Sequence, residues 1–273
     1  MSADSASERA WVAKLREDAQ QSPSAPRVPL WSGNALIGSV EPGLFAQALP
    51  PGAIGAQRWV EETLRGGSRG WQVHGELAAT LALIANAMRE GGFAHTWRNE
   101  QLAVGDDGGP VLASVERGVV RQLGITTHAV HLIGITPDGK HWVQQRSLTK
   151  PNDPGLWDTL MGGMVPASDT LAQSLERETW EEAGFRMDEL RALERGGRIT
   201  TRRPAGDHRA GYVVEHIDWF RCIVPLGVVP CNQDGEVAQF ALMTPDELRN
   251  RLLDEHFTTE AALIFADAGV IAR

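Results

Sequence analysis

Gly163–Phe185 reads GMVPASDTLAQSLERETWEEAGF, and its acidic residues have the spacing of one helix face. Glu178, Glu181 and Glu182 stand at positions i, i+3 and i+4, which lie side by side on a helix. Three carboxylates at close range repel one another and raise one another's proton affinity. A cation relieves that repulsion, and ligation by oxygen alone favours a hard metal such as Mg²⁺ or Mn²⁺. The stretch therefore predicts a metal-binding helix.

The same stretch resembles the signature of the Nudix hydrolases, which runs Gly, five residues, Glu, seven residues, then Arg-Glu-apolar-any-Glu-Glu-any-Gly-apolar. The matching positions are Gly163, Arg177, Glu178, Glu181, Glu182, Gly184 and Phe185. Asp169 replaces the first Glu, and its shorter side chain predicts a weaker structural hydrogen bond. Thr179 replaces an apolar residue and is expected still to pack. The alternative is an acidic helix face exposed to solvent, which would require neither this spacing nor the two flanking glycines.

This resemblance implies a fold, a metal site and a reaction. The fold class is α/β, a Nudix α/β/α sandwich with a mixed sheet, preceded by a smaller α+β domain. The carbonyl oxygen of Gly162 and the carboxylates of Glu178, Glu181 and Glu182 would hold Mg²⁺ or Mn²⁺. Arg177 would pair with a neighbouring carboxylate and fix its rotamer. The reaction implied is hydrolysis of a diphosphate bond.

Further segments narrow the resemblance to one subgroup. Residues 146–150 (RSLTK), residues 154–158 (PGLWD) and residues 234–237 (DGEV) resemble Nudix domains related to the C-terminal part of fungal thiamine pyrophosphokinases. The domain of unknown function that precedes those Nudix domains tends to close with segments like Trp97–Glu100 and Glu116-Arg117. The subgroup implies hydrolysis of thiamine diphosphate analogues, especially oxidised forms, to the monophosphate.

Isopentenyl-diphosphate isomerases share the Nudix fold, and the segment around Arg146 resembles them as well. Those enzymes use a Cys soon after this segment for proton transfer. Residues 158–163 read DTLMGG and contain no Cys, so the isomerase interpretation is disfavoured.

Two sets of basic residues are candidates for binding the diphosphate. Arg146 and Lys150 precede the Pro-Gly loop; an arginine binds phosphate through two nitrogens, and a lysine acts as a point charge. The alternative is that both are solvated surface residues. Arg198, Arg202 and Arg203 form a second, weaker candidate patch.

Catalysis also needs a general base, for which the sequence leaves two choices. The subgroup suggests Glu236, before a predicted strand, as base or additional metal ligand. Glu178 is the competing choice. His128 and His131 are separated by an odd interval on a predicted strand, so they are expected to point to opposite faces and to be structural.

Composition limits the classes of protein to which the chain can belong. Its 273 residues are enough for two domains, which we place at residues 1–122 and 123–273. A net charge of −9 disfavours general nucleic-acid binding. No apolar run reaches the roughly 20 residues that span a bilayer. Cys222 and Cys231 are the only cysteines, so no disulfide framework is implied, and a cytoplasmic location is the default expectation.

The periodicity of apolar residues predicts an order of elements. Helices are expected over residues 1–21, 72–90, 169–183, 244–254 and 258–268, with Ser168 or Asp169 capping the third. Short strands and turns are expected over residues 27–55, and a hairpin is expected from 97–104 and 111–116. Further strands are expected over residues 128–136, 140–146, 158–165, 198–203, 211–224 and 237–243. Alternating helices and strands around one sheet indicate an α/β layered domain.

Three functions stay open at this point. The first is a hydrolase acting on a small-molecule diphosphate, with thiamine diphosphate analogues preferred. The second is a hydrolase of a nucleoside diphosphate linked to another group, such as ADP-ribose or a dinucleotide. The third is a ligand sensor that binds without turnover, although a sensor has no need of three clustered carboxylates. The assembly is also open, with a homodimer among the options.

Overall fold

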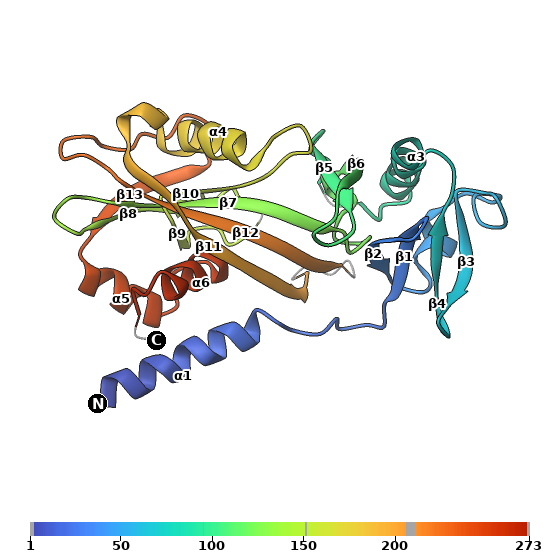
Figure 1. Ribbon diagram of the computed structural model, residues 1–273, viewed down its shortest axis with the longest axis horizontal. Helices are drawn as coiled ribbons and strands as arrows, with labels where there is room; N and C mark the ends of the chain where they lie inside the picture. The colour runs from blue at the N-terminus through green and yellow to red at the C-terminus, as the bar shows by residue number, and fades with distance from the viewer. Residues whose placement is uncertain (1–2, 95, 151, 206–210, 272–273) are drawn as a thin grey trace.

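The computed structural model describes residues 3–94, 96–150, 152–205 and 211–271 (Figure 1). The helices are α1 (Ala3–Asp18), α2 (Leu44–Ala48), α3 (Leu77–Glu90), α4 (Leu171–Ala183), α5 (Pro245–Leu253) and α6 (Thr259–Asp267). The first six strands are β1 (Val28–Ser32), β2 (Ala35–Val40), β3 (Val60–Arg65), β4 (Ser68–Val73), β5 (Gln101–Gly105) and β6 (Val111–Glu116). The others are β7 (Thr126–Ile135), β8 (His141–Arg146), β9 (Trp157–Asp158), β10 (Met161–Met164), β11 (Arg191–Pro204), β12 (Tyr212–Ile223) and β13 (Val237–Met243).

The larger sheet has the order β11-β12-β7-β8-β13, with β10 paired to β7 and β9 paired to β8. β12 runs parallel to β7, whereas the other pairs are antiparallel. Helix α4 covers one face, and α5 and α6 cover the other (Figure 1). Buried Val130 and Leu132 lie on the α4 side, and Ala129 and Ile133 lie on the other. The expected α/β/α sandwich with a mixed sheet is therefore confirmed.

The smaller unit contains a sheet of order β2-β1-β4-β3, the helix α3 and the hairpin β5–β6. Its own core includes Leu30, Phe45, Leu81, Ile84 and Met88. This arrangement confirms a smaller α+β part before the sandwich. Helix α1 lies outside that core, because its Val12 is buried with the α6 side chains. We keep the division into residues 1–122 and 123–273 as a proposal, in which α1 docks on the second unit.

Several predicted boundaries in the N-terminal half are wrong. The helix expected over residues 72–90 begins at Leu77, because residues up to Val73 complete β4. Gly75 adopts a φ of +80°, and Glu76 then caps the helix by accepting hydrogen bonds from two backbone N–H groups. Strands β3 and β4 and the short helix α2 were not predicted at all. Within the described residues, no helix is both long and apolar enough to cross a membrane.

Candidate functional site

Helix α4 presents the three acidic residues to the sheet. Thr170 caps its N-terminus by accepting a hydrogen bond from the backbone N–H of Gln173, whose side chain accepts one from the Thr170 N–H. The prediction that Ser168 or Asp169 is the cap is therefore wrong. Gly184 ends the helix in the left-handed conformation, with a φ of 68°.

The two departures from the Nudix signature keep structural roles. Asp169 accepts hydrogen bonds from Arg177 Nε at 3.1 Å and from Ser174 Oγ at 3.2 Å. The shorter side chain therefore still reaches both partners. Thr179 is fully buried, as expected, and its hydroxyl donates to the Leu175 carbonyl at 2.6 Å.

Glu182 is the most enclosed of the three acids, with 1% of its surface exposed. Its Oε2 accepts hydrogen bonds from the Gly162 N–H at 2.9 Å and from Gln144 Nε2 at 2.7 Å. Its Oε1 lies 3.1 Å from Lys150 Nζ. Burial raises the pKa of Glu182, although these three donors act in the opposite direction.

Glu178 lies against the backbone of Gly163. A Cβ atom at Gly163 would lie 2.0 Å from the Glu178 carboxyl carbon, so any larger residue there would displace that carboxyl group. Burial and then the Glu182 charge raise the pKa of Glu178 to about 7, with Glu181 adding to the rise and Arg177 opposing it. The mutual repulsion expected from the spacing is therefore present.

Arg177 joins the acidic residues on the edge of this face. Its Nη1 donates to Glu178 Oε1 at 2.8 Å and to Glu181 Oε2 at 3.1 Å. The Glu181 side chain is 41% exposed, whereas that of Glu178 is 12% exposed. The arginine thus fixes two carboxylates of unequal burial in one orientation.

Lys150 and Glu236 complete the same constellation, and Arg146, on the strand paired with the residue after Glu236, contacts a different acid. Lys150 Nζ lies 2.5 Å from Glu236 Oε2 and 3.1 Å from Glu182 Oε1, so the lysine bridges two acids. Burial opposes the change, but Lys150 holds the pKa of Glu236 below its usual value. Arg146 Nη1 lies 3.4 Å from Asp158 Oδ2.

Comparison with known proteins decides the family. Residues 126–264, just over half of the chain, match the model of the NUDIX domain. The chain belongs to the Nudix family. The crystal structure of DR0079 from Deinococcus radiodurans has the same fold, with a TM-score of 0.50 at 18% identity over 61% of this chain and 98% of that one.

Two relatives extend the similarity beyond the Nudix domain. The uncharacterized protein YJR142W of Saccharomyces cerevisiae is 27% identical over 185 residues, covering 63% of this chain and 54% of the yeast protein. Nudix hydrolase 24, chloroplastic, of Arabidopsis thaliana is 27% identical over 179 residues, covering 64% of this chain and 48% of the plant protein. The chain thus spans about half the length of each relative.

The Nudix helix has donors that suit a hard cation, although its acids are paired with protein cations. In the ranges described, no group of three or more His, Cys, Asp or Glu side chains is already arranged around one metal position. Lys150 and Arg177 lie against the carboxylates instead. Glu178 and Glu182 both have raised pKa values, caused first by burial. Two enclosed, mutually repelling carboxylates are the kind of donor set that a divalent cation stabilises.

The sequence analysis assigned no site role to two residues, Gln144 and Arg117, which act on Glu182 and Glu236 respectively. Gln144 is 1% exposed, and its Oε1 is buried without a hydrogen-bond partner among the described residues. Arg117 comes from the smaller unit, pairs with Glu100 at 2.6 Å and adds to the lowering of the Glu236 pKa, for which Lys150 is the main cause. The subgroup resemblance at Glu116-Arg117 was a signal that could have identified Arg117.

The arginines of the second candidate patch do not form one group in the structure. Arg198 pairs with the buried Asp218 at 2.7 Å, whereas Arg203 pairs with Glu260 of α6 at 2.8 Å. Arg202 and Arg203 are adjacent on β11 and point to opposite faces of the sheet. The three arginines therefore do not act together.

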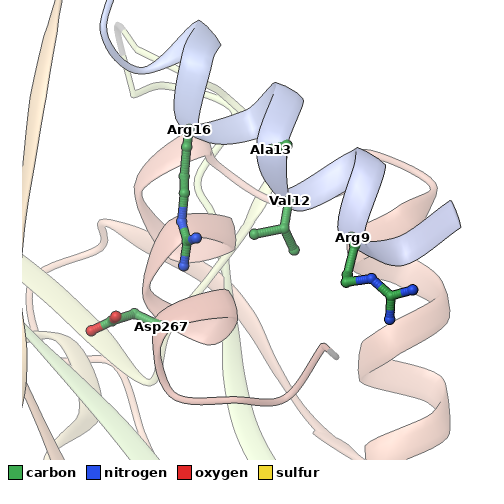
Figure 2. Close-up of a pocket in the computed structure, with 5 residues that line it drawn as sticks. All are labelled: Arg9, Val12, Ala13, Arg16 and Asp267. Carbon is green, nitrogen blue, oxygen red and sulfur yellow. The ribbon is translucent and has the colours of Figure 1, made fainter. Parts of the chain in front are cut away.

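Two cavities lie away from the acidic face of α4. One of about 470 Å³ lies between α1 and α6 and is lined by Arg9, Val12, Ala13, Arg16 and Asp267 (Figure 2). Another of about 260 Å³ lies where the β5–β6 turn meets the large sheet, and Asp107, His128 and Arg198 line it. The ring centroid of His128 lies 5.4 Å from that of His216, whereas His131 contacts Thr159, in agreement with the expected opposite orientations.

Proposed function

We propose that this Nudix protein is a metal-dependent hydrolase that cleaves a diphosphate bond in a small molecule. The observation that carries the proposal is the position of Glu178 and Glu182, which meet over the Gly162-Gly163 backbone beside Lys150. Two carboxylates and one lysine side chain therefore lie together. Cleavage of an anionic substrate requires charged groups around the reacting bond.

The Gly162 carbonyl and the carboxylates of Glu178, Glu181 and Glu182 would hold Mg²⁺, with Mn²⁺ as a substitute. When bound, such a cation neutralises the charge of the diphosphate and polarises its phosphorus atoms. Lys150 already lies 3.1 Å from Glu182, so it would turn toward a phosphate oxygen when the carboxylate is engaged elsewhere.

Among the remaining residues, some would bind the substrate and another would accept a proton. Arg146 and Lys150 would bind the diphosphate. Glu236, held by Lys150 at 2.5 Å and 53% exposed, would accept the proton of the attacking water. Glu178 is the competing base. Arg177 would keep Glu178 and Glu181 oriented while charge develops on the substrate.

We further propose that the substrate is a thiamine diphosphate analogue, above all an oxidised one, which yields the monophosphate and phosphate. The support is the subgroup resemblance, two of whose segments meet where Lys150 pairs with Glu236. Oxidation removes the positive charge of the thiazolium ring, and a nearby cation then no longer repels it. Arg198, Arg202 and Arg203 are the candidates for such a cation, and we favour Arg203, which pairs with Glu260 of α6.

A substrate panel tests the proposal. Phosphate release is measured with Mg²⁺, with Mn²⁺ and with chelator, using oxothiamine diphosphate, thiamine diphosphate, ADP-ribose and a dinucleoside polyphosphate. We expect kcat/KM to fall in the order oxothiamine diphosphate, thiamine diphosphate, ADP-ribose, and chelator to abolish turnover. Efficient cleavage of ADP-ribose with both thiamine compounds inert would transfer the assignment to nucleoside diphosphate derivatives. Tight binding without turnover of any compound would indicate a sensor.

A further inference from the structure

A second polar cluster lies on the face of the large sheet opposite α4. Thr201 of β11, Glu215 of β12 and Thr127 of β7 occupy one row, because Thr201 pairs with Glu215 and Glu215 pairs with Thr127. Paired residues on neighbouring strands present their side chains to the same face. The row therefore places two hydroxyls on either side of one carboxyl group.

Helix α6 brings a second acid to this row. Glu260 stands in the first turn of α6, its side chain is 14% exposed, and Arg203 Nη2 donates to it at 2.8 Å. Burial and then the Glu260 charge raise the pKa of Glu215. Glu215 and Glu260 thus share one nearby arginine, which is already hydrogen-bonded to Glu260.

The row has hydrogen-bonding capacity that the protein does not use. Among the described residues, the Thr127 hydroxyl, at 3.1 Å, is the one donor bonded to the Glu215 carboxyl. Thr201 is fully buried, and its Oγ1 has no hydrogen-bond partner within the part of the chain described. The buried Nε of Arg203 likewise lacks one. Unpaired buried polar atoms are costly in a folded protein, so their presence together indicates a ligand.

The cluster is continuous with the proposed diphosphate contacts. Arg146 Nη1 lies 3.4 Å from Asp158 Oδ2, and Asp158 Oδ1 lies 3.5 Å from His131 Nδ1. His131 and Thr127 lie four residues apart on β7, so their side chains are on the same face of the sheet. Side-chain contacts therefore connect Arg146 to the face of the sheet that carries this row.

We propose that Glu215, flanked by Thr127 and Thr201, binds the ring of the substrate, and that this ring is a flat heterocycle with an amino group, such as an aminopyrimidine. An amino N–H donates to one carboxyl oxygen, and the adjacent ring nitrogen accepts a hydrogen bond from the other oxygen when it is protonated. The free hydroxyl of Thr201 provides a third polar contact. This inference rests on the proposed function, because it assigns the end of the same substrate that is remote from the diphosphate.

The test uses two monophosphates, one with and one without the aminopyrimidine; the second also lacks the thiazolium charge, so each ligand is compared across variants and not with the other ligand. Thiamine monophosphate carries the aminopyrimidine, and the monophosphate of 4-methyl-5-(2-hydroxyethyl)thiazole lacks it. Binding is measured by calorimetry on the wild type, Glu215→Gln and Thr201→Val. Glu194→Gln, whose side chain is 55% exposed on β11, is the matched control. Each variant is first checked for a cooperative thermal transition.

We expect Glu215→Gln to weaken thiamine monophosphate by about tenfold, the scale of one lost charged hydrogen bond, and Thr201→Val by a smaller factor. The thiazole monophosphate should bind all four proteins equally. Equal loss for both ligands, no loss for either, or no binding of thiamine monophosphate to the wild type would overturn the inference. Because binding is measured without turnover, a protein that binds the ring but hydrolyses no diphosphate would refute the proposed function alone.

Discussion

Glu182 and Glu215 are acidic residues on opposite sides of one sheet, and their surroundings differ. Glu182 accepts hydrogen bonds from Gly162, Gln144 and Lys150 and is 1% exposed. Glu215 is half-buried and accepts from Thr127, with the unpartnered Thr201 hydroxyl beside it. Burial is the largest cause of a raised pKa at both.

The contrast indicates two kinds of site. A carboxylate held by several donors keeps one orientation, as a group that must hold a charge at a reacting centre requires. A carboxyl group with spare capacity costs the folded protein free energy until a ligand arrives. We therefore expect the Glu182 side to govern kcat and the Glu215 side to govern which molecule binds.

The largest expected effect tests the first half of that contrast. Glu182→Gln should reduce kcat by at least about 10²-fold while the protein stays folded, since the neutral amide removes a charge from the reacting centre. Glu176→Gln, on the exposed face of the same helix, is the matched control and should retain activity. Near-wild-type turnover of Glu182→Gln with Mg²⁺ would remove Glu182 from the metal site.

A Glu236 variant tests which residue on the same side of the sheet as Glu182 acts as the general base. If Glu236 accepts the proton of the attacking water, Glu236→Gln should lower kcat far more than it raises KM. Asp234→Asn, two residues earlier in the same turn, controls for the loss of a nearby charge. An unchanged kcat for Glu236→Gln would return the role of the base to Glu178 or another residue.

A Lys150 variant tests whether substrate binding and catalysis depend on different residues on the α4 side of the sheet. Lys150→Ala should mainly raise KM, by about tenfold, because it removes a contact to the diphosphate already made in the ground state. Lys140→Ala is the control, since Lys140 is 40% exposed and pairs with Asp138. Initial rates of Lys150→Ala that equal those of the wild type at low substrate would show a merely structural lysine.

The smallest expected effect is on stability and concerns Glu215. Because the folded-state pKa of Glu215 is raised, chiefly by burial and Glu260, the folded protein binds this proton more tightly than the unfolded chain. Wild-type stability should then fall as pH rises above the ordinary glutamate value and through the raised one. Among the surrounding charges, Glu260 adds to the rise in the Glu215 pKa, whereas His131 and Arg121 oppose it.

Glu215→Gln should remove that loss, so the variant should be more stable than the wild type at pH 8 and similar at pH 4. Urea unfolding at pH 4, 6 and 8 measures the difference, and Glu194→Gln controls for the removal of one exposed carboxylate. A difference in stability that does not change with pH would show that the proton on Glu215 plays no part.

The features of the site that were predicted from the sequence depend on the spacing of residues within one helix. Glu178, Glu181 and Glu182 are close because a helix repeats at 3.6 residues, and Arg177 is bound to its neighbours for the same reason. The Thr201–Glu215–Thr127 row was not predicted, because it depends on the register of three strands that are distant in sequence. Strand alternation, which separates Arg202 from Arg203, was readable but was not applied to β11.

Predictions also failed where turns rather than periodicity set the boundary. Val73 continues the apolar pattern of α3 but belongs to β4, and the positive φ of Gly75 and the Glu76 cap mark the division. Arg117 was quoted for resemblance, yet its effect on the Glu236 pKa depends on how the smaller unit packs on the larger one, where the Ala167 N–H donates to the Gln101 carbonyl.

Helix α1 gives the molecule a mechanical property. Val12 is buried beside α6, and the Arg202 N–H donates to the Ala19 carbonyl at 2.8 Å, so the chain is attached to the large sheet before it enters the smaller unit. It returns to that sheet at β7 (Figure 1). Both ends of the smaller unit are therefore attached to the large sheet. After one cut between α1 and β1, the smaller unit would still be joined to the large sheet through β7, at a high effective concentration. In the intact chain, the two connections restrict rotation of the smaller unit about either one.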